Sequence, residues 1–241
     1  MRHSTIAVIA MTMLCSLTLS AESVDAFIQK VRSQLGTEDA LNSVKSIHYK
    51  GKVISPTGEE SSELELIFQA PNYQLLRETN EKAVNQTAVN GYEGYVMSYS
   101  VADPNQKVIR VLAPAQVKRL MANAVENLNF FNGPKKMRKA IIEDGGQVDY
   151  NGQTVRKLVF DYPVSGLSYT RYFDPKSGKL LATTSSDGLT MVEKSSLVVD
   201  GVKFPKSVDT YDDTGALLRT VEFDTVIVNG DIAPDAFDFP N

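Results

Sequence analysis

The sequence predicts a mainly β protein with a few helices, built on one largely antiparallel, meandering sheet. Apolar and polar residues alternate with period two through most of the chain, which is typical of strands with one buried face. Asn151-Gly152, Asp187-Gly188 and Asp200-Gly201 separate such runs, and tight hairpins prefer these dipeptides because both residues tolerate positive φ. A segment with helical spacing, residues 113–129, interrupts the strands near the middle. We therefore expect about ten strands in a single domain that contains a helical insertion.

The first twenty residues have the form of a secretory signal peptide. Arg2 gives a short basic start, residues 6–19 form an uncharged apolar run, and small residues follow at the positions that a signal peptidase reads. The run is too short to span a membrane. Cys15 lies within it, but Leu14 precedes that cysteine where a lipoprotein signal needs a small residue. We expect cleavage after residue 20, which leaves a periplasmic domain of residues 21–241.

Two helices are expected before the first strand. Between residues 21 and 35, apolar residues recur at steps of three and four and form one stripe. Gly36 is a natural helix stop, and Thr37 is suited to cap a second short helix. The pattern changes to alternation from Ile47, which predicts a strand over residues 46–55.

The remaining elements follow from the same two periods. Alternation predicts strands that include residues 63–68, 95–100, 155–162 and 217–228. Pro114 opens the helical segment 113–129, whose apolar side chains share one face. A second short helix is expected over residues 135–142.

The composition gives little support for catalysis or for nucleic-acid binding. The 241 residues carry a net charge of −4, whereas nucleic-acid binding normally needs a concentrated basic face. Without residues 1–20 the chain has no cysteine and one histidine, His48, inside a predicted strand. It has no G-x-S-x-G nucleophile elbow, and one histidine is weak ground for a zinc or copper site. We expect no enzyme activity, no cofactor and no metal.

Short segments over nearly the whole chain follow one recognisable order and spacing. They are Leu35-Gly36 with Ala40-Leu41, Val44-Lys45-Ser46 with Gly51, Ala70-Pro71, Asn90-Gly91 with Gly94-Tyr95, Phe173-Asp174 with Gly178-Lys179-Leu180, Asp200-Gly201 with Phe204-Pro205, and Val226–Asn229 with Phe237. Together they resemble the LolA/LolB-like superfamily of outer-membrane lipoprotein-sorting proteins. The resemblance implies a curved, incomplete antiparallel β-barrel whose concave side is covered by helices and which encloses an apolar cavity.

The resemblance also implies a function, the non-catalytic transport of an apolar ligand such as lipid or lipoprotein acyl chains. The alternative is an envelope sensing or protein-interaction module whose barrel is filled by its own side chains and whose partner is another envelope protein. Large apolar residues either line a cavity or simply fill the core. The expected cavity-lining residues are Leu66, Phe68, Tyr95, Met97, Tyr99, Val117, Met121, Val125, Leu128 and Phe160.

Overall fold

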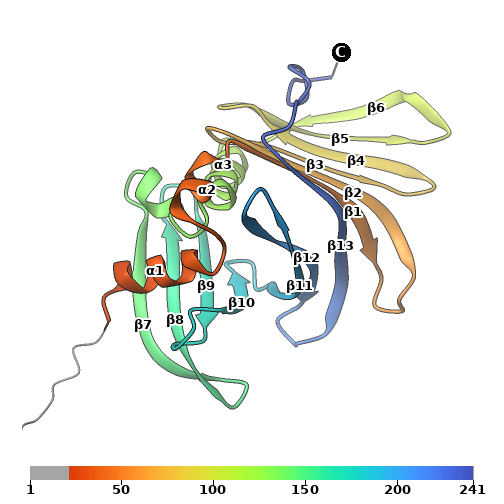
Figure 1. Ribbon diagram of the computed structural model, residues 1–241. Helices are drawn as coiled ribbons and strands as arrows, with labels where there is room; N and C mark the ends of the chain where they lie inside the picture. The colour runs from red at the N-terminus through yellow and green to blue at the C-terminus, as the bar shows by residue number, and fades with distance from the viewer. Residues whose placement is uncertain (1–21, 241) are drawn as a thin grey trace, which may run out of the picture.

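The computed structural model describes residues 22–240, and within them thirteen strands form one antiparallel sheet (Figure 1). The predicted signal peptide, residues 1–20, lies outside the described residues. The helices are α1 (Val24–Ser33), α2 (Glu38–Ser43), α3 (Pro114–Asn129) and the short 3-10 helix η1 (Gly133–Lys136). The strands are β1 (Ser46–Ile54), β2 (Glu60–Gln69), β3 (Tyr73–Thr79), β4 (Ala83–Val89), β5 (Gly94–Ser100), β6 (Asp103–Val111), β7 (Ile141–Tyr150), β8 (Gln153–Tyr162), β9 (Leu167–Phe173), β10 (Leu180–Ser185), β11 (Thr190–Val199), β12 (Val202–Tyr211) and β13 (Leu217–Val228).

The strand order confirms the predicted fold class. It runs β6-β5-β4-β3-β2-β1-β13-β12-β11-β10-β9-β8-β7, so two meanders meet where β1 pairs with β13. Strands β6 and β7 are the two edges, and the sheet formed by residues 22–240 is not closed into a barrel. The sheet curves strongly, and α3, which connects the two edge strands, lies between its two halves (Figure 1).

Tight turns and one close backbone approach shape the sheet. In two hairpins, Asn151-Gly152 and Asp200-Gly201, both residues have positive φ, at 55° and 76° and at 50° and 77°. These are the conformations that the dipeptides predict. Gly51 of β1 lies opposite a bulge in β13, and a Cβ atom here would overlap the backbone carbonyl of Glu222. A side chain at this position would therefore push the two halves of the sheet apart.

Helices α2 and α3 begin where the sequence predicts them, whereas α1 begins at Val24, inside the range 21–35 that the sequence predicts to be helical. The Ser23 hydroxyl accepts a hydrogen bond from the Ala26 N–H, and Thr37 caps α2 by accepting one from the Ala40 N–H, both at 3.2 Å. Helix α3 ends at Phe130, which adopts a left-handed conformation with φ of 46°. The expected helix over residues 135–142 is wrong, because only η1 forms there and β7 begins at Ile141.

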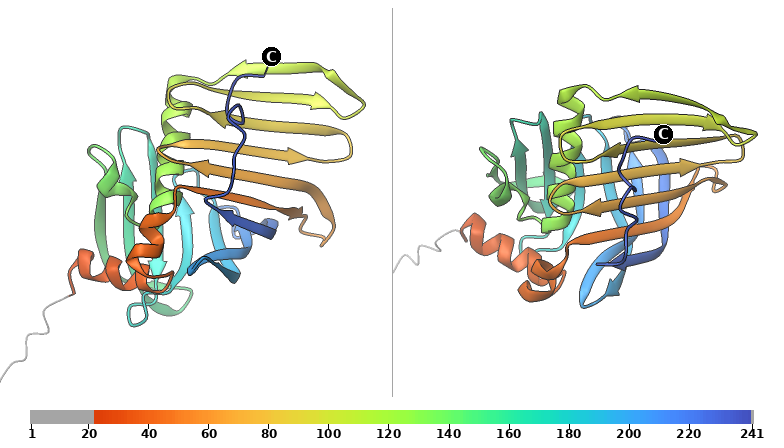
Figure 2. Two further views of the ribbon diagram at one scale, coloured as in Figure 1. Left: turned by 45° about the horizontal axis from the view of Figure 1, so that its top comes forward. Right: turned by 90° about the horizontal axis from the view of Figure 1, so that it is seen from above.

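Both faces of the sheet carry apolar residues. On the concave face, the register aligns Ile47, Phe68, Gln74 and Val89 in one row next to α3. On the convex face of β2 to β5 a separate cluster includes Ile67, Leu75 and Tyr95 and is capped by Phe237. Figure 2 shows the C-terminal segment that carries Phe237 running across these strands.

A buried arginine joins the first two helices to the end of α3. Arg32 is 2% exposed, and its guanidinium donates to both carboxylate oxygens of Glu38 at 2.7 Å. One of its nitrogens also donates to the carbonyls of Asn129 and Phe130, at 2.7 and 2.8 Å. The last carbonyls of a helix lack partners within the helix and favour a positive charge. Arg32 therefore fixes the C-terminus of α3 against α1 and α2.

Replacing this arginine tests the connection. We expect Arg32→Met to lower the free energy of unfolding by about 1–3 kcal/mol, because it leaves the carbonyls of Asn129 and Phe130 without their buried donor. Urea unfolding measures the change. Arg138→Met, at an exposed position, is the control and should change stability little. Equal stability of the two variants would contradict the role of Arg32.

Candidate functional site

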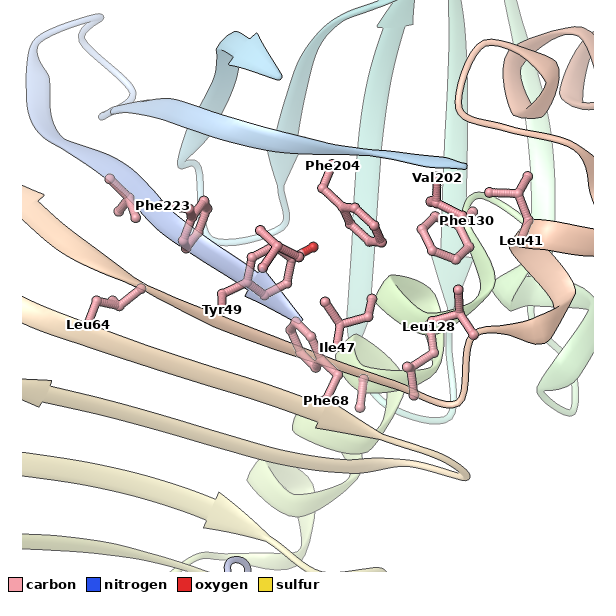
Figure 3. Close-up of a cluster of buried hydrophobic side chains, with 14 of the residues drawn as sticks. Leu41, Ile47, Tyr49, Leu64, Phe68, Leu128, Phe130, Val202, Phe204 and Phe223 are labelled. Atoms are coloured by element: carbon pink, nitrogen blue, oxygen red, sulfur yellow. The ribbon is translucent and has the colours of Figure 1, made fainter. Parts of the chain in front are cut away.

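Aromatic side chains close the concave face at its helical end. Rings from facing strands point toward one another around Tyr49 (Figure 3). The Tyr49 centroid lies 4.7 Å from that of Phe223, 6.1 Å from Phe204 and 6.5 Å from Phe68. Phe130, which follows α3, packs 6.0 Å from Phe204. This end of the barrel is filled by its own side chains.

A buried polar cluster holds α3 against the far half of the sheet. Glu126 of α3 is 4% exposed and accepts hydrogen bonds from the Arg171 guanidinium on β9 and the Tyr162 hydroxyl on β8. Burial is the main reason that the pKa of the Tyr162 hydroxyl is raised, and the Glu126 carboxylate raises it further. The Arg171 guanidinium also lies 4.2 Å from the Phe160 ring centroid and 4.8 Å from that of Phe131. Such cation–π contacts favour the charged group inside an apolar site.

Asn123, one turn before Glu126, touches both halves of the sheet. Its amide nitrogen donates to Gln74 Oε1 on β3 at 2.8 Å, and its Oδ1 accepts from the Tyr169 hydroxyl on β9 at 2.5 Å. Strands β3 and β9 are far apart in the strand order. Helix α3 is therefore a fixed wall of the concave face, held by hydrogen bonds on both sides.

The ion pair of Glu126 and Arg171 gives a testable coupling. We expect Arg171→Met to lower the free energy of unfolding by about 3–5 kcal/mol, because it leaves a buried carboxylate without its cation. Adding Glu126→Leu should restore part of that loss. Urea unfolding of the two single variants and the double variant measures the coupling. Additive losses would show that the two side chains do not interact.

Next to the closed end, a row of apolar side chains remains half-buried. The register aligns Leu66 on β2, Leu76 on β3, Thr87 on β4 and Val96 on β5, beginning from Tyr49 on β1. We call Leu66, Leu76 and Val96 the middle row; each is neither fully buried nor fully exposed. Leu66 and Leu76 are half-buried against the core around Tyr49, as are Leu197 and Val208 of the facing strands β11 and β12. Val96 instead packs partly against Val89 and Val117. These residues offer apolar surface that the protein itself does not cover.

On β3 to β5 the next row of the concave face is polar and forms a rim, whereas on β2 and β13 the same row carries the buried Leu64 and Phe223. The rim contains Glu78, Asn85 and Ser98, in register with Leu64. Arg219 of β13 donates to Glu78 of β3 at 2.9 Å, which joins the two sides of the rim. Apolar surface thus lies between an aromatic-filled end and a charged rim.

One carboxylate lies near the middle of this face. Glu193 of β11 is in register with Val208. Burial is the main reason that the pKa of Tyr49 is raised, and the charge of Glu193 raises it further. Desolvation by the surrounding protein raises the pKa of Glu193, although its side chain contacts water. Lys203, Arg171 and Lys179 oppose this shift. An ionised carboxylate is therefore disfavoured at this position.

The direction of this shift predicts a dependence of stability on pH. The pKa of Glu193 is higher in the folded protein than its ordinary value of 4.5, so folding is penalised as pH rises through the folded pKa. We expect Glu193→Gln to raise the melting temperature at pH 7 and to have a smaller effect near pH ~4, where both states bind the proton. Glu143→Gln, at an exposed site on β7, is the control. A stabilisation that does not change with pH would contradict this account.

The structure divides the expected cavity-lining residues among several surroundings. Leu66 and Phe68 lie on the concave face of β2, and Phe160 lies in the buried cluster beneath α1 and η1. On α3, Leu128 packs into the aromatic-filled end, Val117 packs against Val89, Met121 is half-buried beside it and Val125 is buried. Tyr95, Met97 and Tyr99 lie together on the convex face. The sequence pattern did not identify Leu76, Val96 or Glu193, because period-two alternation does not show which face becomes concave.

Comparisons with solved structures agree on the fold. A DUF1329 family protein from Desulfovibrio piger matches with a TM-score of 0.56 at 8% identity, over 89% of this chain and 97% of that one. A domain assigned to the outer-membrane lipoprotein-sorting proteins, from Vibrio parahaemolyticus, matches with a TM-score of 0.51 at 11% identity, over 88% and 94%. The Pseudomonas aeruginosa MucA/MucB complex matches with a TM-score of only 0.33, which is too low to support an inference.

The sequence comparisons return nothing: no family model and no curated protein matches this chain. Within residues 22–240, no helix is long and apolar enough to cross a membrane. The likeness to known proteins is therefore a likeness of fold. The fold shared with these two structures is the one that the resemblance to the LolA/LolB-like superfamily implies.

Proposed function

We propose that this chain is a non-catalytic binder of an apolar ligand, lipid or lipoprotein acyl chains, in the periplasm. The observation that carries the proposal is the middle row: Leu66, Leu76 and Val96 stay half-buried on a concave face that faces Leu197 and Val208. Each methylene that an acyl chain buries on such a surface contributes about 0.8 kcal/mol. The predicted signal peptide of residues 1–20 would direct the chain to this compartment.

The geometry supports one route of entry for such a ligand. Helix α3 is fixed on both sides through Asn123 and Glu126, and the aromatic cluster around Tyr49 fills the end that it covers. An acyl chain would therefore enter from the polar rim near Glu78 and end against Tyr49. In this arrangement α3 is a wall of the site and does not act as a swinging lid.

Binding and transport of an apolar ligand need no chemical step, which agrees with the few candidate catalytic residues of this chain. His48, the only histidine in residues 22–240, lies on the convex face and pairs with Glu65, away from the middle row. The similar domain from Vibrio parahaemolyticus is assigned to proteins that sort lipoproteins. Both points support a binder in preference to an enzyme.

The second candidate is a sensing or protein-interaction module with a self-filled barrel. The aromatic contacts of Tyr49, Phe204 and Phe223 favour it, since they already fill part of the concave side. The two candidates differ in whether the middle row takes up a ligand.

Binding of a fluorescent fatty acid distinguishes them. We expect delipidated protein to bind cis-parinaric acid, and Leu76→Asp to weaken that binding about tenfold or more, because a carboxylate beside an acyl chain is poorly solvated. Thr79→Asp, on the convex face of the same strand, is the matched control and should bind as the wild type does. Absence of binding by the wild type would reject the carrier function and favour the interaction module.

A further inference from the structure

A separate cavity of about 610 Å³ lies on the convex face, under the C-terminal segment. We call residues 229–240 the C-terminal strap; Figure 2 shows it crossing the outer side of the strands. Two aromatic contacts hold it in place: Phe237 lies 5.4 Å from Tyr73, and Phe239 lies 5.0 Å from Tyr95, between ring centroids. The roof of the cavity is thus anchored to the sheet.

The floor of the cavity is a chain of hydrogen bonds across five strands. His48 Nε2 and Glu65 Oε1 are 2.8 Å apart, and the Arg77 guanidinium donates to Glu65 Oε2 at 2.6 Å. Arg77 Nε donates to Gln86 Oε1 at 2.8 Å, and the Gln86 amide donates to the Tyr95 hydroxyl at 2.6 Å. Gln86 and Tyr95 are 5% and 1% exposed. The floor is therefore preorganised, and its Glu65 and Arg77 charges cancel.

The roof adds uncompensated negative charge. Asp231, Asp235 and Asp238 all line the cavity. Asp238 accepts a hydrogen bond from Asn90 at 3.3 Å, whereas the carboxylates of Asp231 and Asp235 make no hydrogen bond or ion pair within residues 22–240. With the floor neutral, these carboxylates give the cavity a negative potential that favours cations and repels anions.

Apolar side chains complete the lining. Met97 lines the cavity beside the polar floor, and Ile232 and Phe239 of the strap line it from the opposite side. The volume lies within the range of small-molecule sites, about 300–1,000 Å³.

We propose that this cavity binds a small organic amine with an apolar portion. Its ammonium group faces Asp231 and Asp235, and its apolar portion packs against Met97 and Phe239. The site is independent of the acyl-chain site, because the two lie on opposite faces of the sheet. His48, which resembles an ordinary strand residue in the sequence, belongs to its floor.

Calorimetric titration of the full chain tests the proposal with three probes of similar shape. These are 2-phenylethylamine, the neutral 2-phenylethanol and the anionic 3-phenylpropanoate. We expect the amine to bind about tenfold more tightly than the alcohol, and the carboxylate not to bind. Similar affinities for all three probes, or no detectable binding of the amine, would overturn the proposal.

Substitutions in the roof of the cavity test whether the amine binds there. The double variant Asp231→Asn with Asp235→Asn should weaken amine binding about tenfold without changing the fold, since both side chains are exposed. Asp149→Asn, on β7, is the matched control. Phe239→Ala should also weaken binding by loosening the roof. Amine binding that is unchanged in both the double variant and Phe239→Ala would place the amine elsewhere and overturn the assignment, whatever the outcome with fatty acid.

Discussion

The contact on which the rest of the structure depends is the buried carboxylate of Glu126, bound by Arg171 and Tyr162. Because β6 and β7 lie at opposite edges of the sheet, the chain between them must pass from one edge to the other, and it does so on the concave side. Helix α3 makes this crossing, and Glu126 attaches it to the second half of the sheet after Val117 has packed against the first. The other links between the two halves are the β1–β13 pairing, the packing around Tyr49, the hydrogen bonds of Asn123 and the Arg219–Glu78 pair.

The crossing makes the two ends of the concave face different. Beneath α3 the surface is covered, and the aromatic rings around Tyr49 are buried. Beyond it, the middle row and its facing residues keep apolar surface in contact with solvent, up to the Glu78–Arg219 pair. Exposed apolar surface costs free energy in water, and the proposed binding of an apolar ligand rests on this surface.

The sequence predicted element types well, because they depend on local periodicity. The helix over residues 113–129, the capped helices before β1 and the two-residue hairpins follow from spacing, caps and φ preferences. The local pattern did not predict which face of each strand lies on the concave side of the sheet. Tyr95 and Met97 alternate as core residues do, yet they face the strap, because the sheet buries apolar residues on both sides.

Buried charges were predictable only in part. Arg171 interrupts the inward positions Tyr169 and Phe173 of β9, and a charge at an inward position indicates a buried partner. Nothing in the local pattern identifies Glu126 as that partner, since the two are 45 residues apart. Tertiary contacts between distant segments, which no local period encodes, decide the composition of the site.

Photocrosslinking tests the central claim, that the middle row is the ligand-accessible part of the concave face. Delipidated full chain would be irradiated with a palmitic acid analogue that carries a diazirine at the end of its chain, and the adducts mapped by peptide sequencing. The account predicts adducts in β2, β3 and β5 at or beside Leu66, Leu76 and Val96, and in β11 and β12. Adducts confined to the convex face, or spread evenly over the surface, would contradict it.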